Sequence, residues 1–174
     1  MKKIILTLSF LFITTSSFSQ WGVSAGFGSG EASVSVGNLT ESVDYTGLSI
    51  GIINEWDFSE TIKFDSGLSF GSYDTEGSDD RSSQLGLGTT LKFYTSPGSG
   101  FHLRGGISTS LSLEEKVEDF SQTGVGASIG LGLDVSEMLT ITASIATSIT
   151  ESYTGPLDID TDSGAFGVGV IFRF

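Results

Sequence analysis

The C-terminal segment 164–174 alternates between bulky apolar and small or charged side chains up to the last residue. One face of such a strand carries Phe166, Val168, Val170, Phe172 and Phe174, and the other carries Ala165, Gly167, Gly169, Ile171 and Arg173. A period of two over about 9–11 residues is typical of a strand that crosses a membrane with one side toward lipid. Similar alternation occurs in the segments 21–29, 46–57, 61–73, 83–95, 101–113, 124–135 and 139–150. The sequence therefore predicts an all-β chain with eight membrane-crossing strands.

The connections between these segments alternate in length. Short turns are expected at 58–60, 96–100 and 136–138, and longer loops at 30–45, 74–81, 114–123 and 151–163. Outer-membrane barrels have short periplasmic turns, long extracellular loops and aromatic girdles at both interfaces. We assign Tyr94 to the girdle at the short-turn end, and Tyr45 and Tyr73 to the girdle at the loop end. The prediction is an eight-stranded, antiparallel, up-and-down transmembrane β-barrel with both termini in the periplasm.

The N-terminus has the pattern of a secretory signal peptide. Lys2 and Lys3 form a charged region, the apolar segment 4–13 follows, and the small residues Ser17 and Ser19 suit a cleavage site. We predict that residues 1–19 are cleaved and that the barrel domain spans residues 20–174. No later segment approaches the roughly 18 uninterrupted apolar residues of a spanning helix. A secreted chain without such a helix can cross a membrane only as a closed barrel, because lipid cannot satisfy the backbone groups of a sheet edge.

Composition excludes several classes of function. The chain has no cysteine, which rules out a disulfide framework and a Cys-ligated zinc site. Without Lys2 and Lys3, acidic residues outnumber basic ones by 15 in a chain that has 21 acidic residues in all. Such a balance opposes nucleic-acid binding, which depends on Lys and Arg.

A soluble eight-stranded barrel of the lipocalin type, apolar inside and polar outside, is the alternative architecture. A solvated face should carry many Lys and Glu residues, whereas the polar face of these strands consists mainly of Gly, Ser and Thr. Small side chains suit the narrow interior of an eight-stranded barrel. We therefore expect the apolar face to point outward, into lipid.

The signal peptide, the eight strands and the C-terminal Gly-Val-Gly-Val-Ile-Phe-Arg-Phe make the chain similar to the small outer-membrane β-barrel proteins of the OmpA-transmembrane, OmpX and OmpW type. The resemblance covers essentially the whole mature chain and depends on pattern, not on a family-specific motif. It implies insertion by the barrel-assembly machinery, which in this family reads a C-terminal aromatic residue, here Phe174. It does not imply one activity, because these barrels include anchors, adhesins, narrow channels and a few enzymes.

Alternation also places eight charged side chains inside the barrel, all toward the short-turn end. They comprise four acids and four bases: Glu55, Asp57, Asp65, Asp134, Lys63, Lys92, Arg104 and Arg173. Charges in a narrow lumen are costly unless they are paired. We interpret the set as a salt-bridged plug that closes the lower half of the barrel; the alternative is a gate whose pairs exchange to admit small ions. The single histidine, His102, is expected to join it.

Most of the remaining acids fall in the predicted loops. Asp158, Asp160 and Asp162 are weak candidates for a calcium site, because oxygen ligands suit Ca²⁺. The spacing departs from an EF-hand loop, since the glycine, Gly164, comes one place late and position twelve is Gly169 instead of Glu. A solvated acidic surface is the simpler interpretation, and we expect no bound metal and no cofactor.

Catalysis has little support in the sequence. A catalytic triad or dyad needs a histidine close to its partners, and His102 is expected inside the barrel near the short-turn end. We therefore predict a non-enzymatic outer-membrane protein with a structural or surface-interaction role, or alternatively a narrow porin-like channel for small ions or hydrophobic molecules. The expected partners are outer-membrane lipid and lipopolysaccharide, and the barrel-assembly machinery during insertion. We expect a monomer.

Overall fold

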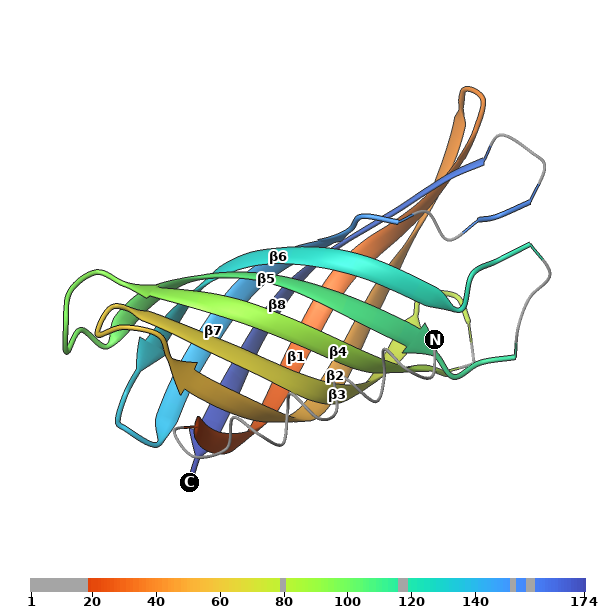
Figure 1. Cartoon of the computed structure of the whole chain (residues 1–174). Coiled ribbons are helices and arrows are strands. Elements are labelled where there is room, and N and C mark those ends of the chain that lie inside the picture. The colour runs from red at the N-terminus through yellow and green to blue at the C-terminus, as the bar shows by residue number, and fades with distance from the viewer. Residues whose placement is uncertain (1–18, 79–80, 116–118, 151–152, 156–158) are drawn as a thin grey trace, which may run out of the picture.

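The computed structural model describes residues 19–78, 81–115, 119–150, 153–155 and 159–174. These residues form eight strands: β1 (Ser19–Val36), β2 (Leu39–Asp57), β3 (Ile62–Thr75), β4 (Arg81–Tyr94), β5 (Phe101–Ser112), β6 (Thr123–Asp134), β7 (Leu139–Ser148) and β8 (Ile159–Arg173). Each strand pairs antiparallel with the next one in the chain, and β8 pairs with β1, so that the sheet closes into a barrel (Figure 1). The predicted eight-stranded antiparallel barrel is confirmed. Among the described residues, no helix is long and apolar enough to cross a membrane.

The two ends of the sheet meet at the short-turn end of the barrel. Phe174 donates its backbone N–H to the carbonyl oxygen of Trp21 at 2.9 Å. An even number of antiparallel strands requires this arrangement, because the chain reverses direction at each connection. The residues before Ser19 lie outside the described part of the chain, and cleavage of the signal peptide stays a prediction.

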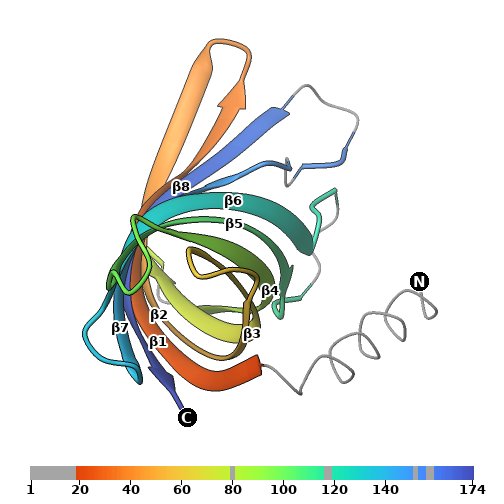
Figure 2. The same ribbon diagram turned by 60° about the vertical axis from the view of Figure 1, so that its left-hand side comes forward.

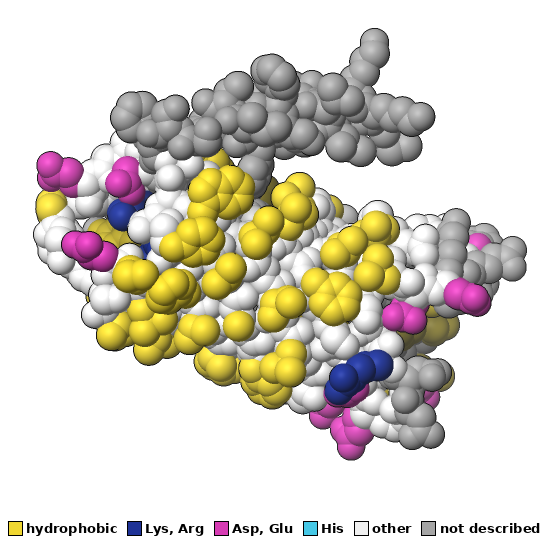
Figure 3. Space-filling model, turned by 90° about the horizontal axis from the view of Figure 1, so that it is seen from below, with side chains coloured by type: hydrophobic (Ala, Val, Ile, Leu, Met, Phe, Trp, Pro, Cys, Tyr) yellow, Lys and Arg dark blue, Asp and Glu magenta, His cyan; other side chains and the backbone are white. Residues whose placement is uncertain are grey.

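The wall of the barrel is apolar on its outer face. Ile50, Ile107 and Ile129 have exposed fractions of 64%, 63% and 62%, and apolar side chains spread across the surface in Figure 3. Inside the described part of the barrel, Ile171 is the only buried hydrophobic residue. The opposite would hold in a lipocalin-type barrel, so this arrangement excludes that alternative.

Five predicted strands agree with the structure to within two residues at each end, but β1, β2 and β8 are much longer than predicted. The expected loop at 30–45 is wrong. Val36 pairs with Leu39 across a two-residue turn, Gly37-Asn38, and Gly37 has a φ of 61°. Tight hairpins need positive φ at the turn, which glycine adopts without strain. A Gly-Asn pair between alternating residues was therefore a usable hairpin signal.

The expected loop at 151–163 is also wrong in its last part, because residues 159–163 belong to β8 and pair with residues 32–36 of β1. Together, residues 31–36, 39–44 and 159–163 form a three-stranded sheet that continues beyond the rest of the barrel. We call it the projecting sheet. It is the long arm formed by β1, β2 and β8 in Figures 1 and 2.

Three tyrosines assigned to the aromatic girdles lie inside the barrel. Tyr94 is two residues from the inward-facing Lys92, and it contacts Asp134 across the lumen. Tyr45 and Tyr73 line the lumen near the loop end, with ring centroids 6.0 Å apart. Strict alternation along β2, β3 and β4 would have placed all three correctly.

Candidate functional site

The eight predicted inward charges lie together at the short-turn end of the barrel. They come from β2, β3, β4, β5, β6 and β8, and ion pairs connect all of them into one network. We call this network the charged layer; its members are Glu55, Asp57, Lys63, Asp65, Lys92, Arg104, Asp134 and Arg173. Each residue points inward because it occupies the same alternation position as the glycines and serines of its strand.

Glu55 is the centre of the charged layer. Its carboxylate pairs with Lys63 Nζ at 3.3 Å, with Arg173 Nη2 at 3.1 Å and with Lys92. The side chains of Glu55, Lys92 and Arg173 are 2%, 0% and 3% exposed. Three bases therefore converge on one carboxylate that water hardly reaches.

The other carboxylates complete the charge balance. Asp65 pairs with Lys92 Nζ at 2.7 Å and with Arg104 Nη2 at 3.6 Å. Asp57 pairs with Lys63 Nζ at 3.1 Å, but its side chain is 68% exposed at the rim of the barrel. The layer thus changes from a buried centre to a solvated edge.

Asp134 extends the layer toward two residues that the sequence analysis did not assign to it. Arg173 Nη2 lies 3.4 Å from Asp134 Oδ1, Tyr94 donates its hydroxyl to Oδ2 at 2.8 Å, and Thr140 donates its hydroxyl to Oδ1. Tyr94 and Thr140 face inward at the same end, so the alternation signal could have identified them. Their neutral hydroxyl groups hold Asp134 in place through charge-assisted hydrogen bonds to its carboxylate.

His102 lies beside this group, as expected. Its side chain is 0% exposed, and Nδ1 is 4.0 Å from Asp134 Oδ2. The ring lies 4.7 Å from that of Tyr94, measured between centroids, and it fits only because residue 132 is glycine. A Cβ atom on Gly132 would come within 2.1 Å of His102 Nε2. The histidine therefore fills space between strands at this level.

Above the charged layer the lumen opens into a cavity of about 780 Å³. Asp65 and Arg104 lie among its lining residues, the walls are mainly Ser, Thr and Gly, and Tyr45 and Tyr73 lie near the loop end. Tyr45 donates its hydroxyl to the carbonyl oxygen of Gly164 at 3.3 Å, which links β2 and β8. The lumen is thus polar but nearly uncharged in its outer part and strongly charged in its inner part.

In the projecting sheet the apolar and polar side chains lie on the opposite faces from those in the membrane-spanning wall. In the wall, the apolar residues of β1 point outward, whereas in the projecting sheet they lie on the face that continues the lumen lining. Along that face the apolar side chains are Ala32, Val34 and Val36 of β1, Leu39 and Val43 of β2, and Ile159 of β8. The opposite face carries Glu31, Asp44, Asp160 and Asp162. Acidic side chains on the outer face are consistent with a part of the sheet that lies outside the lipid bilayer.

The apolar face of the projecting sheet is open to solvent. Val34, Val36, Leu39 and Val43 are 41%, 51%, 77% and 46% exposed. One acid, Glu41, lies on the same face, opposite Val34. Contiguous exposed apolar residues above the membrane are a feature of interaction surfaces.

The remaining predicted site residues are placed as follows. Asp160 and Asp162 lie exposed on β8, opposite Ser35 and Ser33 of β1, and Asp158 is outside the described residues. Within the described ranges no group of three His, Cys, Asp or Glu side chains could hold a metal ion. The side chain of Phe174 is largely exposed at the short-turn end, and its role in assembly stays a prediction.

Comparisons with solved structures identify similar barrels. The chain is 17% identical to the attachment invasion locus protein Ail of Yersinia pestis, with a TM-score of 0.54, covering 90% of this chain and 99% of Ail. It is 16% identical to Neisserial surface protein A, with a TM-score of 0.52, covering 87% and 97%. It is also 16% identical to the outer membrane enzyme PagL, with a TM-score of 0.51, covering 88% and 99%. At this level of identity the comparisons show a shared fold.

A search of curated protein sequences finds no match. The family model described as "Outer membrane protein beta-barrel domain" matches residues 4–174. With the closed barrel and its apolar outer wall, this match places the protein in the bacterial outer membrane. The chain belongs to the outer membrane protein β-barrel domain family.

Proposed function

We propose that this protein is a surface-interaction protein whose projecting sheet binds a partner polypeptide. The observation that carries the proposal is the apolar face of that sheet, which is exposed to water at the loop end. Burying apolar side chains stabilises a complex by about 25 cal/mol for each Å² removed from water. The sheet also ends in strand edges beyond β3 and β7, and such edges can pair with an added strand.

The charge around this face favours a basic partner segment. Glu41 lies among the apolar residues, and Asp44, Asp160 and Asp162 lie on the reverse side of the same sheet. A strand that alternates apolar and basic side chains, added at the edge of β2 or β8, would place its apolar residues beside the valines and its basic residues on the reverse face, beside Asp44, Asp160 and Asp162. A second copy of this acidic chain would meet like charges instead.

The proposal includes a closed lumen. Lys92, Glu55 and Arg173 are almost fully buried at the short-turn end, and their ion pairs cross the interior. Separating such pairs would leave charges unpaired in a narrow space, at a cost of several kcal/mol. A narrow channel remains the second candidate, because the cavity of about 780 Å³ extends inward as far as Asp65 and Arg104.

We further propose that the protein is not an enzyme and acts as a monomer, with lipopolysaccharide and lipid as its surroundings and the barrel-assembly machinery as its partner during insertion. His102 is fully buried beside the charged layer, which supports the first point, since a substrate arriving from the loop end would have to pass that layer. The net acidity of the chain opposes nucleic acid as a partner.

Peptide binding tests the interaction surface. The protein in nanodiscs is titrated with a labelled peptide of alternating Val and Lys, and with the same peptide carrying Glu in place of Lys. We expect the Lys peptide alone to bind, and the double variant Val34→Ser/Val36→Ser to weaken it about thirtyfold, since two buried Val residues at on the order of 1 kcal/mol each contribute about 2 kcal/mol together. Ser33→Ala/Ser35→Ala, on the opposite face, is the matched control. Equal binding of both peptides, or an equal loss in the control, would refute the proposal.

Planar-bilayer recordings test the lumen. We expect no steady unit conductance from the unmodified protein. Reproducible single-channel steps would favour the narrow channel over the closed barrel.

A further inference from the structure

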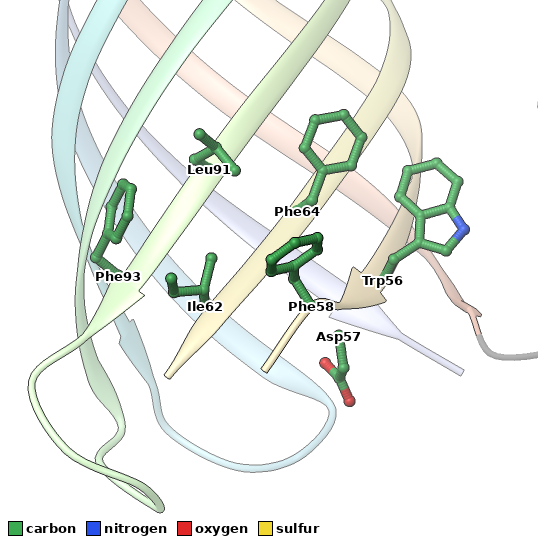
Figure 4. A pocket seen from close by; sticks show the side chains of 7 residues that line it. All are labelled: Trp56, Asp57, Phe58, Ile62, Phe64, Leu91 and Phe93. Carbon is green, nitrogen blue, oxygen red and sulfur yellow. The ribbon is translucent and has the colours of Figure 1, made fainter. Parts of the chain in front are cut away.

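A hollow on the outer wall lies at the short-turn end of the barrel. Two rows of apolar side chains line it: Trp56, Phe64 and Leu91 in one row, and Phe58, Ile62 and Phe93 in the next (Figure 4). Its volume is about 450 Å³. Packing of Trp56 against Phe64, with ring centroids 5.3 Å apart, holds the first row together.

The hollow opens where β2 ends. The strand stops at Asp57, so Phe58 has no strand neighbour to cover it and is 83% exposed. Asp57 marks the lower edge of the hollow (Figure 4). The shape of the hollow thus depends on where β2, β3 and β4 end and on the size of their aromatic side chains.

The hollow belongs to the surface that contacts lipid. Its apolar residues follow the same outward alternation as Ile52, Leu68 and Leu87, which are 49%, 52% and 40% exposed. In an outer-membrane barrel the short turns face the periplasm, so this level meets the inner, phospholipid leaflet. An apolar recess within this surface is filled best by a hydrocarbon chain, because an empty recess would forfeit the dispersion contacts of its walls.

The charges at this rim differ sharply in their exposure. The acids Asp57, Glu60 and Glu137 are exposed. Asp57 pairs with Lys63 Nζ at 3.1 Å, but its side chain is 68% exposed, so it still faces the surroundings of the barrel. The bases at the same end belong to the charged layer, where the side chains of Lys63, Arg104, Arg173 and Lys92 are 28%, 15%, 3% and 0% exposed. A headgroup beside the hollow therefore meets carboxylates. An ammonium group is attracted to them, and an anionic headgroup is repelled.

We propose that the hollow binds one acyl chain of a periplasmic-leaflet phospholipid with an ammonium headgroup, such as phosphatidylethanolamine. The chain lies between Trp56, Phe58 and Phe93, and the ammonium group lies near Asp57 and Glu60. This site is independent of the projecting sheet and of whether the lumen conducts.

Tryptophan fluorescence can test this site, since the chain has only two tryptophans. The variant Trp21→Phe leaves Trp56, in the wall of the hollow, as the only reporter. The protein is placed in phosphatidylcholine vesicles that contain a small fraction of phosphatidylethanolamine or phosphatidylglycerol with identical brominated acyl chains, which quench nearby tryptophan. We expect the ethanolamine lipid to quench Trp56 several times more strongly than the glycerol lipid.

Two further variants make the test specific. In Trp21→Phe/Trp56→Phe/Glu137→Gln/Ile141→Trp the reporter lies on the outer face of β7, two residues from its start at the same end, and the exposed acid of the adjoining turn is removed. We expect equal quenching by both lipids at this position. In Trp21→Phe/Asp57→Asn/Glu60→Gln the preference at Trp56 should disappear. The heat-dependent gel mobility of each variant verifies that its barrel is folded. Equal quenching at Trp56, the same preference at residue 141, or a preference that survives loss of the two carboxylates would each overturn the proposal.

Discussion

Neutralising Glu55 should destabilise the barrel more than any other single charge change at the short-turn end. Glu55→Gln keeps the shape of the side chain but removes the carboxylate that Lys63, Lys92 and Arg173 share. The three bases then depend on Asp57, Asp65 and Asp134. The charged layer keeps four positive groups against three negative ones.

The expected size of the effect follows from burial. Removing one partner of a buried ion pair typically costs about 3–5 kcal/mol. Here each base keeps a second carboxylate, since Lys92 Nζ still has Asp65 at 2.7 Å and Arg173 Nη2 still has Asp134 at 3.4 Å. We therefore expect a loss near the lower limit, about 3 kcal/mol in the free energy of unfolding.

Asp57→Asn is the matched control. It removes a carboxylate from the same network, but the Asp57 side chain is 68% exposed. Water screens this ion pair, so the loss should stay below about 1 kcal/mol. The double variant Glu55→Gln/Lys92→Met removes one charge of each sign and should recover more than half of the loss caused by Glu55→Gln, because three bases then face three acids and the layer is again balanced.

Urea unfolding of the protein in lipid vesicles, followed by tryptophan fluorescence, measures these differences. Heat-dependent gel mobility gives an independent estimate of the folded fraction. If Glu55→Gln and Asp57→Asn were equally stable, or if the double variant were worse than Glu55→Gln alone, burial would not control the energy of the charged layer and the reasoning would fail.

Two other predictions use different parts of the chain. Gly132→Ala should cost about 2–3 kcal/mol, because the added methyl group would overlap the enclosed ring of His102, with 2.1 Å to Nε2; Gly28→Ala, whose nearest contact is at 3.5 Å, should change stability by less than about 1 kcal/mol in the same urea titration. Phe174→Leu should lower the amount of folded barrel in the outer membrane of expressing cells several-fold, while the refolded protein keeps its urea midpoint, because the backbone N–H that bonds to Trp21 is retained and the replaced side chain is 70% exposed. A normal amount of folded barrel in those cells would argue against an assembly signal at Phe174.

Much of this protein could be predicted from its sequence, because a strand repeats every two residues. That period alone separates Phe166, Val168 and Val170 from Gly167 and Gly169, and it gives the number of strands. It also places the eight residues of the charged layer inside, because they share the alternation position of the small residues. Applied consistently, the same period would have placed Tyr45, Tyr73 and Tyr94 in the lumen.

The projecting sheet was missed for a physical reason. The sequence signal of a membrane strand is the apolar face that contacts lipid. Outside the membrane a strand does not need an apolar outer face, so this signal is absent there. Val34, Val36 and Val43 then follow the opposite alternation position from Phe27 and Ile50, so the pattern changes within a continuous strand. Only the Gly37-Asn38 turn marked the hairpin locally.

The sequence by itself determined the class of fold, the membrane it crosses and the inward position of the eight residues in the charged layer, since these depend on local alternation along each strand. Only the tertiary structure decided which charges touch. Glu55 became the centre of the charged layer because closure of β8 onto β1 brings Arg173 next to it, and Tyr94 and Thr140 reach Asp134 from other strands. Barrel closure and strand stagger bring together residues that are distant in the chain. A local sequence pattern carries no information about such contacts.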